Sequence, residues 1–281
     1  MFRSLDHLIL MTRDLPSASS DYSKVFGCEP VWRGVHDGLG TENAIFSVNN
    51  TYLEILAPRA KGAGADFVNS VIHADGEGLA GLALETSDIG RLKKELSERK
   101  VPTKKIVSGA DLDSQQDKSR TWQNLFFSRD LTRGLFIFAI QHESERLQES
   151  KVSRSKIDRL DHVVVHTNDP DGFVSLYRDK FGIKLSLDQT VEKWGGRMLF
   201  FRLNRTTIEV IGKIEKDGIP KDSFWGLAWS VSDLKAVHRR LTDVGVEVSN
   251  IRDGRKPRTI VCTVKSHTRG VPTLLIEHLD R

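Results

Sequence analysis

An internal repeat limits what this chain of 281 residues can fold into more than any other feature. The segment "LDHLILMTRDL" (residues 5–15) returns as "LDHVVVHTNDP" (160–170), which places His7 and His162 at positions that differ by 155 (162 minus 7). The same offset relates Glu54, in "YLEIL", to Glu209, in "TIEVI". The match runs without gaps through the glycines that end the first helix of each half, so the two halves are duplicates.

Each half also divides in two. The segments that begin at Gly81 and Gly226 repeat the opening order of strand, aspartate and helix, and they end alike in "RGLFIFAIQH" and "RGVPTLLIEH". This second alignment, with an offset of 136, pairs Gln141 with Glu277. The chain is therefore four copies of one module.

Periodicity predicts the elements of that module. Runs such as "HLILM" and "HVVVH" are short and apolar and favour strands, whereas Leu234, Val237 and Leu241 have helical spacing and are followed by Gly245, a stop signal. Two or three strand-like runs follow each helix, so every module is expected to be βαβββ. The fold class is α+β, with two tandem domains over residues 1–143 and 157–281, joined by a charged linker over 144–156.

Composition excludes several classes of protein. The net charge is only +4, no basic stripe appears, and no apolar run approaches the length of a membrane span, so neither nucleic acid nor a membrane is expected as a partner. The two cysteines, Cys28 and Cys262, are too few for a disulfide framework. A cytoplasmic protein that is a monomer or a homodimer is the expectation.

Four βαβββ modules with histidine on the first strand and glutamate on the last resemble the vicinal oxygen chelate superfamily, which includes glyoxalase I, extradiol dioxygenases and bleomycin resistance proteins. "RGVHDGLGTENAIF" leading into "YLEILAP" is similar to an uncharacterised glyoxalase-like group within it. The resemblance implies curved mixed sheets with the helices outside, and a metal ion inside each cup.

The resemblance also implies ligands. In the second domain they are His162, Glu209 and Glu277, with Gly226 at the fourth place, and in the first domain a weaker set is His7, Glu54 and Gln141, with Gly81 at the fourth place. Strand alternation assigns His142 and His278 to the opposite face.

This donor set indicates a chemistry. One histidine with two carboxylates suits a divalent ion such as Zn, Mn, Fe, Ni or Mg, and three protein ligands leave a position open for substrate. The ion would stabilise a developing enolate or oxyanion, while Glu277 or Glu209 moves a proton. His36 and Asn43 in the first domain are candidates for contact with a small oxygenated substrate. Arg255 and Arg258, in a basic loop of the second domain, would attract such a substrate if it is anionic.

Several functions remain open at this point. The first is a metal-dependent lyase or isomerase of the glyoxalase kind. The alternatives are a metal-free protein that sequesters a small molecule, a ring-cleaving dioxygenase (disfavoured because the second histidine is missing), and a structural duplicate whose histidines are core residues.

Overall fold

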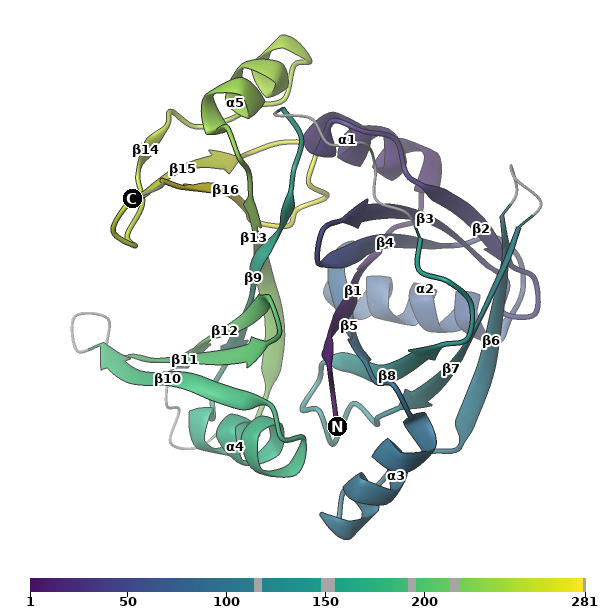
Figure 1. Cartoon of the computed structure of the whole chain (residues 1–281). Coiled ribbons are helices and arrows are strands. Elements are labelled where there is room, and N and C mark those ends of the chain that lie inside the picture. Colours follow the sequence, from purple (N-terminus) through teal and green to yellow (C-terminus); the bar gives the residue numbers. More distant parts are fainter. Residues whose placement is uncertain (114–117, 148–154, 192–195, 213–217, 280–281) are drawn as a thin grey trace.

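The computed structural model describes residues 1–113, 118–147, 155–191, 196–212 and 218–279. The expected linker over 144–156 includes residues 148–154, which lie outside the described residues, so the domain boundary remains a prediction. The described residues form an α+β fold of two tandem halves with curved mixed sheets (Figure 1), as predicted.

The first half contains two modules with one helix between them. Its elements are β1 (Ser4–Met11), α1 (Leu15–Phe26), β2 (Trp32–His36), β3 (Thr41–Val48), β4 (Thr51–Pro58), α2 (Ala63–Asp75), β5 (Gly78–Glu85), α3 (Ile89–Glu98), β6 (Ile106–Asp113), β7 (Ser119–Phe126) and β8 (Phe136–His142).

The second half repeats this order without a described counterpart of α2. Its elements are β9 (Arg159–Thr167), α4 (Pro170–Val174), a π-helical turn η1 (Ser175–Lys180), β10 (Lys184–Val191), β11 (Gly196–Leu203), β12 (Thr206–Gly212), β13 (Asp222–Ser230), α5 (Leu234–Asp243), β14 (Arg252–Asp253), β15 (Thr259–Val264) and β16 (Thr273–His278).

An aspartate starts the helix of every module, as the repeat predicts. The carboxylates accept hydrogen bonds from backbone N–H groups three residues on, which satisfies donors that a helix N-terminus otherwise leaves unpaired. The four caps are Asp14, Asp88, Asp169 and Asp233.

The two sheets differ in closure. The first closes into a barrel in the order β1-β4-β3-β2-β6-β7-β8-β5, because Gly34 and Val35 of β2 pair with Asp113 and Leu112 of β6. The second sheet stays open, in the order β10-β11-β12-β9-β13-β16-β15-β14. The edge strand β14 has only two residues where its equivalent β6 has eight, so it offers little backbone for closure.

Helix α2 was not predicted, and it covers part of one end of the barrel. Its residues Val68, Val71 and Ile72 are buried and form one cluster with Ile9 and Met11 from the inner face of β1. The space left inside the barrel therefore lies between α2 and the opposite end.

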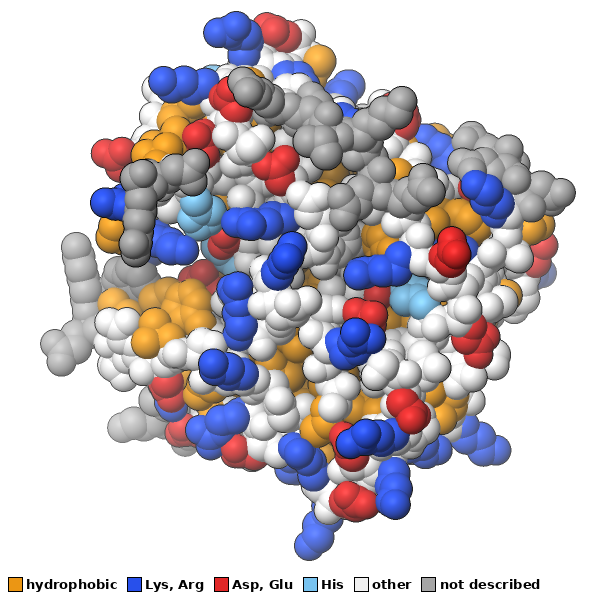
Figure 2. Space-filling model, viewed as in Figure 1, with side chains coloured by type: hydrophobic (Ala, Val, Ile, Leu, Met, Phe, Trp, Pro, Cys, Tyr) orange, Lys and Arg blue, Asp and Glu red, His pale blue; other side chains and the backbone are white. Residues whose placement is uncertain are grey.

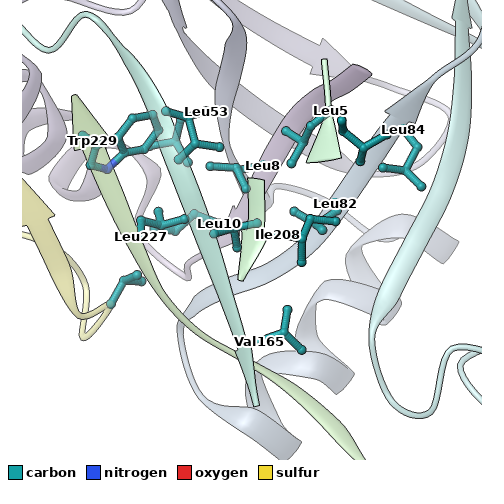
Figure 3. Packing of buried hydrophobic residues seen from close by; sticks show 14 of the residues in the cluster. Leu5, Leu8, Leu10, Leu53, Leu82, Leu84, Val165, Ile208, Leu227 and Trp229 are labelled. Atoms are coloured by element: carbon teal, nitrogen blue, oxygen red, sulfur yellow. The ribbon is translucent and has the colours of Figure 1, made fainter. Parts of the chain in front are cut away.

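The outer faces of the two sheets form a single core. Leu8, Leu10 and Leu53 of the first half meet Val165 and Leu227 of the second, with β1 and β5 facing β9 and β13 (Figures 1 and 3). Helix α1 extends this contact, because the ring centroids of Phe26 and Trp229 are 4.9 Å apart. The duplicates are thus packed against each other rather than joined only by a chain.

Two equivalent arginines tie the halves together reciprocally. Arg133 of the first half pairs with Asp169 and Asp222 of the second, and Arg269 of the second pairs with Asp21 of the first. Burial raises the pKa of the Asp222 carboxyl to about 6, and the charge of Arg133 only partly opposes this increase.

No helix in the described part of the chain is both long and apolar enough to cross a membrane. On the face shown in Figure 2, basic side chains are spread over both halves with acidic ones between them.

Candidate functional site in the first barrel

A β-bulge at the same place in both halves prepares the site. Between β1 and β5 the pairing steps from Leu5 to His7 and skips Asp6, and between β9 and β13 it steps from Leu160 to His162 and skips Asp161. A bulge inserts one residue and turns its side chain away from strict alternation. Neighbouring aspartate and histidine side chains can therefore touch, which the sequence pattern did not reveal.

In the first half this bulge organises a chain of four side chains. Asp6 Oδ1 lies 2.6 Å from His7 Nδ1, and Asp6 Oδ2 lies 2.9 Å from His142 Nε2. His7 Nε2 in turn lies 3.3 Å from Glu54 Oε2. We name these residues, His142, Asp6, His7 and Glu54, the first tetrad.

Burial and charge set the ionisation of the first tetrad. Burial would raise the pKa of Asp6, but hydrogen bonds to His142 and His7 outweigh it and hold this pKa far below its usual range. Burial would lower the pKa of His7, but Asp6 and Glu54 raise it to about 9, and the pKa of Glu54 falls to about 2 because the contact with His7 outweighs burial. In the first tetrad a charged, buried His7 therefore lies between the carboxylates of Asp6 and Glu54.

The second half holds an equivalent tetrad of His278, Asp161, His162 and Glu209. Asp161 lies 2.8 Å from His162 and 2.7 Å from His278, and His162 lies 3.3 Å from Glu209. The difference is burial, since the side chain of Asp161 is 24% exposed whereas that of Asp6 is 0% exposed. Burial raises the pKa of Glu209, and the charges of His162 and Arg255 oppose this effect without overcoming it.

The first tetrad borders a cavity of about 580 Å³ inside the barrel. Strand alternation builds its walls, since every second residue of a strand faces inward. The lining includes Arg120, Trp122, Asn124 and Phe126 from β7, Phe136, Phe138, Ile140 and His142 from β8, and Tyr52, Glu54 and Leu56 from β4. Exposed residues Lys104, Arg129 and Asp130 also line the cavity, which therefore opens to solvent beside them.

A second group of polar side chains continues from Glu54 along β3, β2 and β6. Asn43 Nδ2 donates to Glu54 Oε1 at 2.7 Å and to Asp111 Oδ2 at 3.3 Å, and Trp32 Nε1 donates to the same Asp111 oxygen at 2.6 Å. His36 Nε2 lies 3.6 Å from Asp111 Oδ2, and burial raises the pKa of Asp111. Polar groups from β1, β2, β3, β4 and β6 thus converge in an otherwise apolar chamber.

The predicted ligands are only partly brought together. His7 with Glu54, and His162 with Glu209, are neighbours, whereas Gln141 and Glu277 point to helices. Gln141 Oε1 accepts from the backbone N–H of Ile89 at 2.8 Å, and Glu277 Oε2 accepts from that of Leu234 at 2.7 Å, so both side chains cap a helix N-terminus.

Strand register explains this outcome. Strands β1 and β5 run antiparallel, with His7 paired to Ala83 and Ile9 paired to Gly81. Exchanging the two strands turns one of these pairs into the other, so Gly81 on β5 is the equivalent of His7 on β1, and Ala83 is the equivalent of Ile9. Glu54 on β4 pairs with Ile9, and Phe138 on β8 pairs with Ala83. Phe138 is therefore the equivalent of Glu54. Its ring centroid is 5.8 Å from that of His7.

These residues do not fit a metal centre with three protein ligands. In the first half, Gly81 and Phe138 take the places that should complete the set. Nowhere in the described residues do three or more His, Cys, Asp or Glu side chains assemble in a way that could hold an ion. No chemical step is therefore assigned to a metal here.

The other predicted contact residues lie in two places. His36 and Asn43 line the cavity, as described above. Arg255 and Arg258 lie in the exposed loop between β14 and β15 of the second half, where the charge of Arg255 reaches Glu209.

Sequence reasoning missed Asp6, Asp161 and both partner histidines. The repeat carried the signal, because Asp6 and Asp161 share the offset of 155, and His142 and His278 share that of 136. The prediction that His142 faces away from the site is wrong: Ile140 and Phe138 face the cavity, so His142 does too, and Gln141 takes the opposite face.

Fold and site define a class: tandem βαβββ modules whose sheets curve around a His–Glu pair. The chain belongs to the glyoxalase-like family of the vicinal oxygen chelate superfamily. Residues 5–158 match the family described as "Glyoxalase-like domain", and residues 161–263 match "Glyoxalase/Bleomycin resistance protein/Dioxygenase superfamily".

Solved structures share this fold over the whole chain. A mutant of 4-hydroxymandelate synthase from Streptomyces coelicolor aligns with a TM-score of 0.72 at 14% identity, covering 100% of this chain and 95% of that one. A hypothetical protein from Staphylococcus aureus aligns with a TM-score of 0.66 at 15% identity, covering 97% and 98%. No curated protein matches the sequence. At these identities the neighbours establish the fold alone.

Proposed function

We propose that the first barrel binds a small, largely apolar molecule with a polar oxygen-bearing group, and that it does so with its own side chains. The cavity carries this proposal. Its volume of about 580 Å³ lies in the range of small-molecule sites, and such sites are mostly apolar with a few convergent polar groups.

The barrel also orients such a molecule. Phe126, Phe136 and Phe138 offer aromatic surface, and His7, Glu54 and Asn43 offer donors and acceptors on adjoining walls. The second half has an equivalent tetrad on an open sheet, so it has less surface with which to enclose a ligand.

Blocking the cavity tests the proposal. Leu56 on β4 lines the cavity, and its equivalent Ile211 on β12 lies on the open sheet of the second half. The neutral dye N-phenyl-1-naphthylamine, whose emission rises in apolar surroundings, should bind the wild type and Ile211→Trp but bind Leu56→Trp at least about tenfold more weakly. Equal binding to both variants, or no binding to the wild type, would contradict the proposal.

A second candidate is a lyase or isomerase that moves a proton within the bound molecule. The observation that favours it is the contact of His7 with both Asp6 and Glu54 beside the cavity, since a carboxylate often orients a catalytic or metal-binding histidine in this way. A divalent ion would need further ligands from substrate or water.

Metal analysis separates the two candidates. The metal content of the purified wild type, His7→Gln and His162→Gln can be measured by mass spectrometry. About one equivalent that is lost in His7→Gln would favour the metal-dependent enzyme, whereas no metal after reconstitution with each divalent ion favours the binding protein.

A further inference from the structure

Arg120 is a buried cation in the wall of the cavity. It lies on β7 with 7% exposure, and its guanidinium carbon sits 5.4 Å from the ring centre of Trp32 and 6.0 Å from those of Tyr52 and Trp122. Aromatic faces attract a guanidinium, but they provide no hydrogen-bond acceptor in its plane.

Within the described residues, Arg120 has no anionic partner. None of their carboxylates lies within 4.0 Å of it, and its buried Nε has no acceptor. Asp111 pairs with Arg120 across β6 and β7, but its Oδ2 accepts from Trp32 and Asn43, and its buried Oδ1 makes no hydrogen bond to Arg120 either. A buried charge without a partner is costly, so a group of this kind calls for a partner that the described side chains do not supply.

The position of Arg120 suits the far end of a bound molecule. The cavity opens beside Lys104 and Arg129, near the end of the barrel where Ile106 pairs with Leu125. Arg120 lies five residues before Leu125 on β7, which places it roughly 17 Å from this end of the barrel at the usual rise per residue of a strand. The inward side chains between, Trp122 and Asn124, belong to the same wall.

We propose that Arg120 binds the carboxylate of a ligand whose apolar body lies along the aromatic wall toward the opening. This inference rests on the proposed function of the first barrel and adds the chemical class of its ligand. The planar fork of a guanidinium matches a carboxylate through two parallel hydrogen bonds. A phosphate would fit the fork as well, but the nearby carboxylates of Glu54 and Asp111 repel a doubly charged group more strongly than a singly charged one.

Displacement of the neutral dye by a matched pair of compounds tests this subsite. The compounds are 4-phenylbutanoate and its uncharged amide, 4-phenylbutanamide, which share size and apolar body. The wild type should bind the acid about tenfold or more tightly than the amide, because a hydrogen-bonded charge contributes at least this much.

Variants assign the preference to Arg120. Arg120→Met should bind the acid and the amide equally, with amide affinity close to that of the wild type, and Arg120→Lys should keep only part of the preference because it keeps the charge and loses the fork. Arg91→Met, at an exposed arginine of α3, is the control and should behave as the wild type.

Three results would overturn the inference. They are equal displacement by acid and amide in the wild type, a preference that survives in Arg120→Met, and displacement by inorganic phosphate at the same concentration as by 4-phenylbutanoate. Failure of the neutral dye to bind the wild type at all would instead refute the proposed function, so the two failures are distinguishable.

Discussion

The duplicated tetrads allow one prediction with a matched internal control. The variants are Asp6→Asn and Asp161→Asn, which remove the same charge from equivalent bulges and keep the shape of the side chain. Distances to the two histidines are similar, 2.6 and 2.9 Å for Asp6 and 2.8 and 2.7 Å for Asp161. Any difference between the variants therefore reports burial.

Burial should make the first change much more costly. Asp6 is fully buried, and removing one partner from a buried, hydrogen-bonded charge network costs about 3–5 kcal/mol of unfolding free energy. Asp161 is 24% exposed, so water screens part of its interactions with the two histidines and the expected cost is smaller, about 1–2 kcal/mol.

Urea unfolding at pH 7, followed by circular dichroism, measures both costs. The midpoint should fall in both variants and clearly further for Asp6→Asn than for Asp161→Asn, with similar slopes. Equal costs, or a larger cost at Asp161, would refute the reasoning that burial distinguishes the two tetrads.

Two further predictions concern the walls of the barrel and the cysteines. A Cβ at Gly34 would lie 2.1 Å from Asp111 Oδ1, so Gly34→Ala should displace that carboxylate. We expect this change to lower the unfolding free energy by about 1–3 kcal/mol and to weaken dye binding. A Cβ at Gly38 meets no atom within 4 Å, so Gly38→Ala is the control and should match the wild type in both assays. Burial raises the pKa of the Cys262 thiol to about 11. At pH 8 a disulfide reagent should therefore modify Cys28 in the native protein and reach Cys262 only after urea is added. Modification of both cysteines at equal rates would contradict the predicted burial.

The repeat made most of the fold predictable. Offsets of 155 and 136 residues relate helix caps, strands and the His–Glu pairs, because duplicated modules keep the residues that start helices and fill equivalent places. The order of strands and helices in each module follows from the same alignment.

The sequence could not predict features that depend on register and closure. A bulge at Asp6 changes which neighbours touch, and no periodicity marks it. The last strand was aligned by its glutamate and glutamine, whereas strand pairing puts Phe138 opposite Glu54 and sends Gln141 to a helix. Closure of the first sheet depends on the pairing of β2 with β6, which are far apart in the sequence.

The central claim is that the first barrel binds its ligand without a metal ion. The measurement that tests it most directly is titration of the wild type with N-phenyl-1-naphthylamine before and after exhaustive dialysis against a chelator, with the metal content of each sample determined in parallel. The account predicts the same affinity in both samples and no gain when a divalent ion is restored. Loss of binding on chelation and recovery on addition of one divalent ion would contradict it.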